Sequence, residues 1–316
     1  MRTYVVYRHD DAINDFFKSN TTVTRQQCDD FAIARAGDVQ GVCSYTVTAG
    51  PNKSKLFQFR EADSTIDMRN ISLAKAVHSE FVASCTYLGA LGDSRPLHIY
   101  EMETLPRTAH IMAQFHQTTC PGRDRFFAQS WNYDQRPCSD DTDILIRDFE
   151  YNFDVLAQDL PSRFTPNLER VHKELPSLFS SALPFVLSHR DLNVMNILAN
   201  PKTGNITGIV DWAESRILPF GFALYGLKNL LGWMDSTGRH YYDHHRELEI
   251  LFWKTFRGEL TISPIFIAAR KTGLFYHYGL VFDVQGAVQS VREEQPDGSL
   301  EYLNAFCTAG EWDPVL

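Results

Sequence analysis

The sequence predicts an α+β protein with two lobes, a small sheet-containing N-terminal lobe and a larger, mainly helical C-terminal lobe. The N-terminal part alternates between helical and strand patterns, whereas helical spacing of apolar residues dominates after Pro106. We place the boundary just before this point, which gives an N-terminal lobe of residues 1–104 and a C-terminal lobe of residues 105–316. Hydrophobic residues make up 44% of the 316 positions, which is enough for one large core or two smaller ones.

The N-terminal lobe is predicted to contain a helix, a hairpin, a second helix and a further strand. Thr24–Ala36 has helical spacing and is followed by Gly37, a residue type that commonly ends helices. The runs GVCSYTVTAG and KLFQFRE are rich in β-formers and meet at a turn around Gly50, which predicts the hairpin. The second helix is predicted over Asp67–Tyr87 and the further strand over Leu97–Glu103.

The C-terminal lobe is predicted to consist of helices that surround two short strands. The apolar runs FVLSH and NITGIVDW lie between Phe185 and Trp212 and flank the polar segment HRDLNVMNILANPKTG. Helices are predicted over four segments, Asp143–Leu156, Pro166–Phe179, Arg246–Phe256 and Pro264–Phe282. The polar segment with its two strands is therefore expected in the middle of a helical lobe.

The charge balance limits the classes of partner. Lys and Arg number 30 and Asp and Glu number 39, which gives a net charge of −9. A protein that binds the phosphate backbone of nucleic acid needs a basic face, so we expect a small-molecule substrate and no nucleic-acid partner. No apolar run reaches about 18 residues, so no membrane span is expected.

The cysteines and the N-terminus favour a cytoplasmic protein. The cysteines form no C-x-x-C pair and no Cys/His cluster at zinc-ligand spacing, so reduced thiols are expected. They stand at Cys28, Cys43, Cys85, Cys120, Cys138 and Cys307. The N-terminal residues lack the uninterrupted apolar stretch of a signal peptide.

The segment from His189 to Asp211 has the composition of a phosphoryl-transfer site. Asn196 follows Asp191 by five positions, and a second apolar run ends at Asp211. Phosphoryl transfer requires a carboxylate that accepts or orients a hydroxyl proton, and oxygen ligands that hold Mg²⁺ against the nucleotide phosphates. The chain is expected to enter an apolar strand after Asn196, and a turn at Thr203–Gly204 is expected to fold this strand against the run that ends at Asp211. This hairpin would bring Asn196 close to Asp211. For any one aspartate alone, capping of a turn is the simpler explanation.

The motifs SHRDLNVMNIL and GNITGIVDWAE resemble the H-x-D-L-x-x-x-N-I-L … G-I-I-D-W-E signature of the aminoglycoside phosphotransferase and choline kinase-like family. The run DWAESRILPFGFALYGLKNLLG is similar to a fungal subgroup of that family, whose substrate is unassigned. The resemblance extends from about Cys28 to Phe282. It implies a bilobal protein-kinase-like fold and transfer of the γ-phosphate of ATP, with Mg²⁺, to a hydroxyl or an amine of a small metabolite.

The resemblance also implies a role for each residue of the motif. Asp191 would be the catalytic base, or the group that orients the acceptor hydroxyl. Asn196 and Asp211 would hold Mg²⁺. His189 would hold the loop in place by packing and hydrogen bonding. Arg190 is left open between pairing with a carboxylate and facing solvent.

Nucleotide contacts are implied in the N-terminal lobe. Gly41 would let the backbone approach a phosphate, and Ser44 could donate its hydroxyl to one. The backbone between Met102 and Leu105 resembles the hinge that would hydrogen-bond adenine.

The phosphate-binding cation of the family is missing at its expected position. The preferred alignment puts Gln58 there, with Arg60 two residues further along the strand and therefore on the same face. Glutamine has no charge to offset that of a phosphate. Either Arg60 takes its place, or nucleotide binding is weak.

Two other functions are weighed against a small-molecule kinase. A degenerate kinase-like protein that acts by binding a ligand or partner is motivated by Gln58. A protein kinase is disfavoured because Trp212 follows Asp211 and because an A-P-E segment is absent. The acceptor site is expected from the insert at Pro121–Ile146 and from the C-terminal helices.

Overall fold

The chain folds into two compact units in the computed structural model. One consists of Thr3–Ala109 with Thr207–Glu214, and the other of His110–Ile206 with Ser215–Leu316. The structure describes residues 8–19, 21–32, 35–36, 43–105, 129–130, 133–135, 137, 139–200, 203–235, 237–259, 264–282, 287–293 and 298–307. The lobe boundary after residue 104 stays a prediction.

An antiparallel sheet of five strands forms the first unit, in the order β1-β2-β3-β5-β4. The strands are β1 (Arg35–Ala36), β2 (Ser44–Ala49), β3 (Lys55–Arg60), β4 (Cys85–Leu91) and β5 (Leu97–Glu103). β2 and β3 form the predicted hairpin, and Gly50 adopts a φ of 76° in its turn. This left-handed conformation costs glycine little, which is why the chain can turn there.

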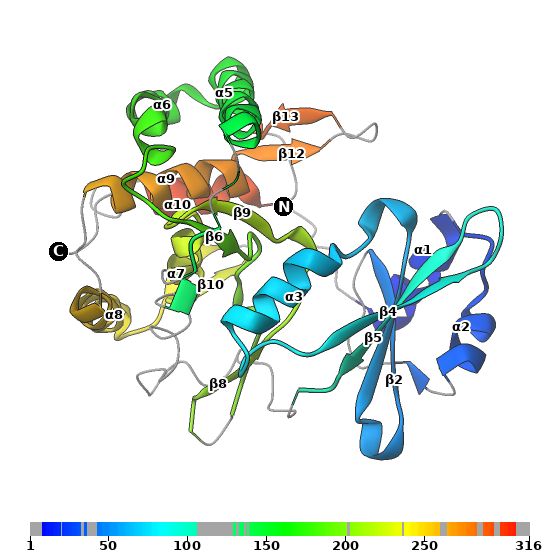
Figure 1. Cartoon of the computed structure of the whole chain (residues 1–316). Coiled ribbons are helices and arrows are strands. Elements are labelled where there is room, and N and C mark those ends of the chain that lie inside the picture. Colours follow the sequence, from blue (N-terminus) through cyan, green and yellow to red (C-terminus); the bar gives the residue numbers. More distant parts are fainter. Residues whose placement is uncertain are drawn as a thin grey trace. The chain divides into compact units, whose positions relative to one another are not determined.

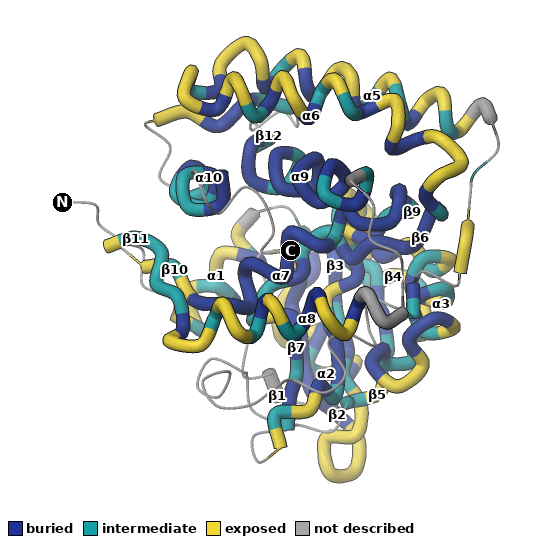
Figure 2. Tube along the Cα trace, turned by 90° about the vertical axis from the view of Figure 1, so that its left-hand side faces the viewer, coloured by how far each residue is buried: buried dark blue, intermediate teal, exposed yellow. Residues whose placement is uncertain are grey.

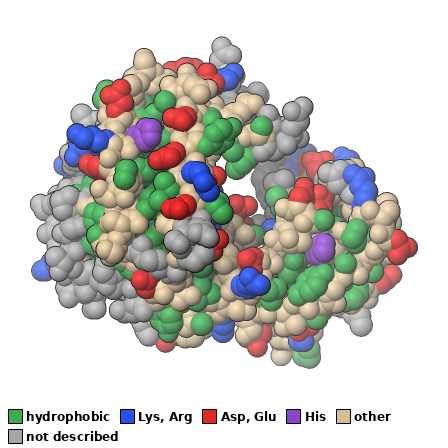
Figure 3. Space-filling model, turned by 45° about the horizontal axis from the view of Figure 1, so that its top comes forward, with side chains coloured by type: hydrophobic (Ala, Val, Ile, Leu, Met, Phe, Trp, Pro, Cys, Tyr) green, Lys and Arg blue, Asp and Glu red, His purple; other side chains and the backbone are tan. Residues whose placement is uncertain are grey.

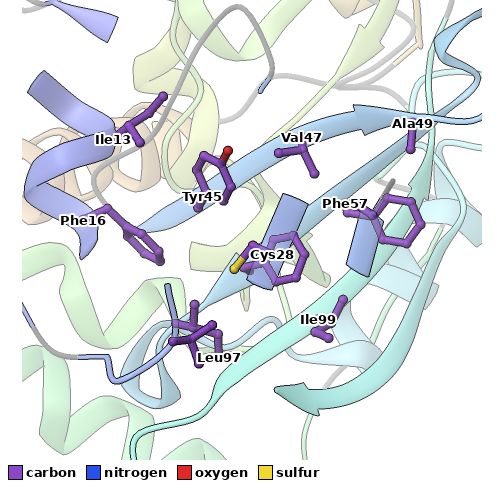
Figure 4. Packing of buried hydrophobic residues seen from close by; sticks show 12 residues of the cluster. Ile13, Phe16, Cys28, Tyr45, Val47, Ala49, Phe57, Leu97 and Ile99 are labelled. Carbon is purple, nitrogen blue, oxygen red and sulfur yellow. The ribbon is translucent and has the colours of Figure 1, made fainter. Parts of the chain in front are cut away.

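The core of this unit lies between the sheet and two helices, α1 (His9–Ser19) and α2 (Arg25–Ala32) (Figures 1 and 4). Alternate residues of β3 face it, so Phe57 and Phe59 are buried there while Gln58 and Arg60 share the opposite face. Figure 4 shows the side chains that gather in this core, Ile13, Phe16, Cys28, Tyr45, Val47, Ala49, Phe57, Leu97 and Ile99.

The helix predicted over Asp67–Tyr87 is wrong in its second half. The observed helix α3 spans Met68–Val77, with the side chain of Asp67 accepting a hydrogen bond from the Arg69 backbone NH at its start. Cys85–Leu91 forms the edge strand β4 and pairs with β5. Pairing with a strand that lies further along the chain overrides the local helical spacing, a tertiary effect that single-segment patterns miss.

The helix predicted over Thr24–Ala36 is also too long. It ends at Ala32, and Arg35–Ala36 pairs with β2 instead. The cause is the same as for β4. The backbone of Arg35–Ala36 forms its hydrogen bonds with the sheet, so these residues do not need a further helical turn to satisfy their NH and CO groups. In the second unit, the helix predicted over Pro264–Phe282 ends at Tyr278, and Leu280–Phe282 forms a strand.

The second unit is mainly helical, and its buried helix is α9 (Pro264–Tyr278), which is dark along most of its length in Figure 2. α5 (Ser139–Asp159) and α6 (Thr165–Leu178) alternate buried and exposed positions, as amphipathic helices at a surface do. They confirm the helices predicted there. The other helices among the described residues of this unit are α7 (Gly226–Asn229), α8 (His245–Glu259) and α10 (Ser299–Cys307).

Short strand pairs connect the helices of the second unit. Their bounds are β6 (Phe185–Ser188) with β9 (Arg216–Pro219), β10 (Gly232–Asp235) with β11 (Gly238–Tyr241), and β12 (Leu280–Phe282) with β13 (Val288–Ser290). A further pair, β7 (Ile197–Ala199) with β8 (Ile206–Ile209), is the hairpin expected around Thr203–Gly204, and β8 belongs to the first unit from Thr207 on. Gly204 has a φ of 71° in this turn.

Gly273 allows α9 to contact the 3₁₀ turn Phe222–Tyr225 closely. A Cβ at this position would lie 2.0 Å from the carbonyl oxygen of Phe222, so no other residue type fits without movement of one backbone against the other. α9 and the turn are therefore held in one relative position.

A group of buried charges joins α7, α8 and α9. The Lys228 ammonium lies 2.9 Å from one oxygen of Glu249, and the Arg270 guanidinium lies 3.8 Å from the other. All three side chains are buried. Since a buried charge is costly unless it is paired, Glu249 compensates two cations at once.

The surface gives two observations on partners. None of the helices in the described part of the chain is long and apolar enough to span a membrane. On the face shown in Figure 3, acidic and basic side chains are interspersed. The cytoplasmic location and the lack of a nucleic-acid partner stay predictions.

Phe59→Ala is expected to lower the free energy of unfolding by about 3–5 kcal/mol, because truncation of a fully buried phenylalanine removes contacts and leaves a cavity. Leu88→Ala is the control, since Leu88 is 43% exposed on the edge strand β4, and it should change the free energy by only about 0.5 kcal/mol. Urea unfolding followed by circular dichroism measures both. Equal losses would contradict the core described above.

Glu249→Gln is expected to lower the free energy of unfolding by about 3–5 kcal/mol, because it leaves two buried cations without the carboxylate between them. Glu247→Gln, on the same helix, is the matched control. Its side chain is 74% exposed and pairs with His244, so its loss should cost about 0.5 kcal/mol or less. A small effect of Glu249→Gln would show that the two cations are compensated in another way.

Candidate active site

The carboxylate of Asp191 is held on both of its oxygens. Asn193 Nδ2 donates to Oδ1 at 2.8 Å, and Asn196 Nδ2 donates to Oδ2 at 2.9 Å and to the Asp191 carbonyl at 2.8 Å. Asn193 also caps the short turn Val194–Asn196, since its side-chain oxygen accepts from the Met195 NH at 2.8 Å. The loop after β6 therefore fixes the direction in which the carboxylate points.

Asn196 is suited to hold a metal ion. Its side-chain nitrogen is used in the two hydrogen bonds to Asp191, while its Oδ1 accepts none from the described residues. Asn196 is 8% exposed. Its Oδ1 does not appear among the fully buried side-chain atoms of the described residues that have no hydrogen-bond partner. An amide oxygen left over in this way is a hard ligand of the kind that Mg²⁺ takes.

Asp211 lies at the end of β8, in the first unit. Its carboxylate is exposed and makes no hydrogen bond or ion pair with a described residue. Trp212 anchors the segment, since its ring stacks on His78 with 5.8 Å between the ring centres and its Nε1 donates to the Ile209 carbonyl. The buried tryptophan thus holds the backbone while the neighbouring carboxylate remains available.

Backbone strain coincides with these positions. Among the described residues, those other than glycine with a positive φ are Asn52, Lys53, Arg190 and Asp211. Asn52 and Lys53 lie in the β2–β3 turn, where such angles are ordinary. Arg190, at 66°, and Asp211, at 64°, lie at the residues that the sequence singled out. Strain of this kind clusters at functional sites.

His189 and Arg190 are placed by packing. His189 is buried, at 2% exposure. The Arg190 guanidinium lies over the ring of Tyr276, 5.1 Å from its centre, a contact that the sequence did not suggest. A cavity of about 20 Å³ is lined by Arg190, Tyr225 and His277, among others. It has room for about one water molecule and is too small for a metabolite.

Gln58 and Arg60 lie on one face of β3, as predicted. Arg60 is 5% exposed, and its guanidinium donates from Nε to the Ser64 carbonyl at 2.6 Å and from Nη1 to the Gln58 side chain at 3.3 Å. It forms no ion pair with a carboxylate of the described residues. Ser44 is buried in β2 opposite Arg60.

Arg60 and Asp211 act on the same thiol. Cys43 is exposed, and the pKa of its thiol is raised by partial desolvation, lowered by the charge of Arg60, and raised by Asp211 and Glu214. All four residues belong to the first unit. The charges of Arg60, the candidate phosphate-binding residue, and of Asp211, the candidate metal ligand, therefore both affect the pKa of Cys43.

The other residues predicted to contact the nucleotide are Gly41, Met102 and Leu105, and they differ in how they are placed. Gly41 lies outside the described residues. Met102 lies opposite Leu56 and Cys85 and is inside the sheet, whereas Leu105 lies beyond the end of β5. Of the two, Leu105 is therefore the better candidate for a backbone contact with adenine.

The expected pairing of Asn196 with Asp211 stays a prediction, because the two belong to different compact units. The described residues contain no group of three His, Cys, Asp or Glu side chains that could hold a metal. Sequence reasoning missed Asn193, although an asparagine side chain commonly hydrogen-bonds the backbone two residues further on, as Asn193 does with the Met195 NH. Much of the insert expected to form the acceptor site lies outside the described residues.

Comparison with known proteins supports the resemblance. Residues 96–247 match the model of the phosphotransferase enzyme family. No curated protein matches the chain in sequence. Among solved structures, the chain is similar to aminoglycoside phosphotransferase APH(3'')-Id from Streptomyces rimosus in complex with ADP and streptomycin, at 13% identity and a TM-score of 0.50, over 77% of this chain and 91% of that one.

A second similar structure is amicoumacin kinase hAmiN in complex with AMP-PNP, Ca²⁺ and Ami. It is 13% identical, with a TM-score of 0.53, and the match covers 89% of this chain and 92% of that one. At such identities the likeness establishes the fold. The chain therefore has the bilobal, protein-kinase-like α+β fold of the aminoglycoside phosphotransferases, and the resemblance of its motif-bearing segment to the phosphotransferase enzyme family is confirmed.

Proposed function

We propose that this protein transfers the γ-phosphate of ATP, with Mg²⁺, to a hydroxyl or an amine of a small metabolite. The observation that carries the proposal is the arrangement at Asp191, whose two carboxylate oxygens are held by the side-chain amides of Asn193 and Asn196. A base must lie within hydrogen-bond reach of the proton that it takes, in a fixed orientation. Asp191 meets the second condition before any substrate binds.

Asn196 and Asp211 are the proposed ligands of Mg²⁺. Each has a side-chain oxygen that accepts no hydrogen bond from the described residues, and both oxygens are of the hard type that Mg²⁺ prefers. When bound, the ion would offset the negative charge of the nucleotide phosphates. The complexes of the similar structures, with ADP in one and with AMP-PNP and Ca²⁺ in the other, support this assignment.

Arg60 is the proposed phosphate-binding cation in place of Gln58. Its guanidinium is oriented by Ser64 and Gln58, which are neutral partners, so its charge is not offset by a carboxylate of the described residues. A buried cation with that surplus charge suits an anionic ligand. Gln58 therefore supports Arg60 and does not itself need to carry the charge.

The alternative, a degenerate kinase-like protein that only binds a ligand or partner, rests on Gln58. Arg60 lies beside Gln58 on the same strand and can carry the positive charge that Gln58 lacks, so Gln58 alone does not argue against catalysis. A small molecule as the acceptor agrees with the similar structures, whose complexes contain streptomycin in one and Ami in the other.

Asp191→Asn should lower phosphate transfer by about 10²- to 10⁴-fold, the usual contribution of a general base. Its affinity for ATP with Mg²⁺ should stay within about twofold, because Asp191 is not a proposed metal ligand. Asp211→Asn should instead abolish the Mg²⁺ dependence of ATP binding. Transfer is measured as ATP-dependent gain of one phosphate in a metabolite extract, and binding by calorimetry with and without Mg²⁺.

Asp154→Asn, on the exposed side of α5, is the matched control and should leave both measurements unchanged. Full transfer by Asp191→Asn would remove the proposed base. A wild-type protein that binds no ATP at millimolar concentration would favour the non-catalytic alternative.

Arg60→Gln should weaken ATP binding by about 10- to 100-fold, the loss expected for a hydrogen bond between charged partners. Adenosine, which has no phosphate, should bind to the variant as it does to wild type. Arg60→Lys keeps the charge and should recover part of the ATP affinity. Calorimetric titrations with the two ligands measure these effects.

Gln58→Ala is the comparison variant for this experiment, since Gln58 touches Arg60 but carries no charge. It should lower ATP affinity much less than Arg60→Gln does. If the order of the two variants is reversed, Gln58 is the phosphate contact and Arg60 is a structural residue.

A further inference from the structure

The carbonyl just before Asp191 is held by a side chain of the 3₁₀ turn Phe222–Tyr225. The hydroxyl of Tyr225 donates to the Arg190 carbonyl, and the ring of His277 packs against that of Tyr225. The two rings stack with 4.5 Å between their centres. The Tyr225 hydroxyl thus reaches the residue whose backbone is left-handed.

The carbonyl just after Asp191 is held in a similar way. Asn229 Nδ2 donates to the Leu192 carbonyl at 3.2 Å, and the Asn229 side-chain oxygen accepts from the Tyr278 hydroxyl at 2.6 Å. Asn229 is 7% exposed and Tyr278 is equally buried. Because Tyr278 orients the amide, the donor that reaches Leu192 is fixed.

Gly226 allows these contacts. A Cβ there would lie 2.8 Å from the Leu192 carbonyl oxygen and 3.1 Å from the Leu192 Cβ, so a side chain would push α7 away from the loop. Tyr225 and Asn229 are four residues apart and therefore lie on the same side of a helical turn. Tyr225 and Asn229 therefore donate hydrogen bonds to the backbone on either side of Asp191, and Gly226 between them leaves room for the Leu192 backbone.

The donors keep their hydrogens at neutral pH. Burial raises the pKa of Tyr225 well above its ordinary value and also raises that of Tyr278, so both hydroxyls stay protonated. Burial, with the charge of Arg190, lowers the pKa of His277 to about 4. His277 is therefore neutral and adds no charge beside the Arg190 guanidinium.

We propose that Tyr225, Gly226 and Asn229, supported by His277 and Tyr278, form a template that fixes the backbone on both sides of Asp191 and so positions its carboxylate. All of these residues belong to the second compact unit. The template acts through Asp191, so its members are positioning residues. The inference rests on the proposed function for its effect on turnover, but its effect on the loop is independent of it.

Tyr225→Phe tests the template, because it removes only the hydroxyl. Backbone amide exchange at residues 190–193 of the nucleotide-free protein should rise about tenfold, the effect of one lost hydrogen bond. The kcat for phosphate transfer should fall about tenfold, while the KM for ATP stays within about twofold. Gly226→Ala should change both quantities in the same direction.

Tyr302→Phe is the matched control. Tyr302 stacks on Tyr278, but its hydroxyl makes no hydrogen bond with a described residue. It should leave the exchange of residues 190–193 and the kcat at wild-type values. Thermal unfolding of every variant shows whether the second unit is still folded at the assay temperature.

Faster loop exchange together with a lower kcat at unchanged KM supports the template. Unchanged exchange in Tyr225→Phe overturns it, and so does faster exchange with unchanged kcat, which would leave Tyr225 a purely structural residue. If the wild-type protein transfers no phosphate, the proposed function fails. The amide exchange then still decides whether Tyr225 fixes the loop.

Discussion

The left-handed backbone at Arg190 is the constraint on which the catalytic loop depends. A residue other than glycine in this conformation carries strain of about 1–2 kcal/mol, so the surroundings must hold it there. The hydrogen bond from Tyr225 to the Arg190 carbonyl provides that hold, with the ring of His277 stacked on Tyr225, and the ring of Tyr276 contacts the guanidinium. Asp191 follows directly, and its direction is then set by the loop's own asparagines.

Close packing within the second unit makes this hold possible. Gly273 lets α9 approach the turn that contains Tyr225, and the buried charges of Lys228, Glu249 and Arg270 tie α7 and α8 to α9. Tertiary contacts that look purely structural thus support the active loop. A protein interior is packed too densely for such contacts to shift without effect on their neighbours.

The first unit contains two of the proposed ligand-binding residues, Arg60 for the phosphates and Asp211 for Mg²⁺. Its sheet holds Arg60 with neutral partners, and the segment that ends in Asp211 is anchored to it through Trp212 and His78. Within the part of the chain that the structure describes, Arg60 has no carboxylate partner and Asp211 has no cation partner, so each is suited to a charged ligand. Both charges affect the pKa of the Cys43 thiol, which Arg60 lowers and Asp211 raises.

The sequence by itself determined the α+β class of fold and two hairpins, β2 with β3 and β7 with β8, because these depend on local periodicity and on turn residues. It also singled out Asp191, Asn196 and Asp211 through short motifs, and their roles stay proposals. It did not determine that Cys85–Leu91 would be a strand, since that segment is decided by pairing with β5. It identified Arg60 as a candidate but could not show its neutral partners. The contacts of Tyr225 and Asn229 with the loop were also beyond it, because they join residues more than thirty positions apart, which only tertiary packing brings together.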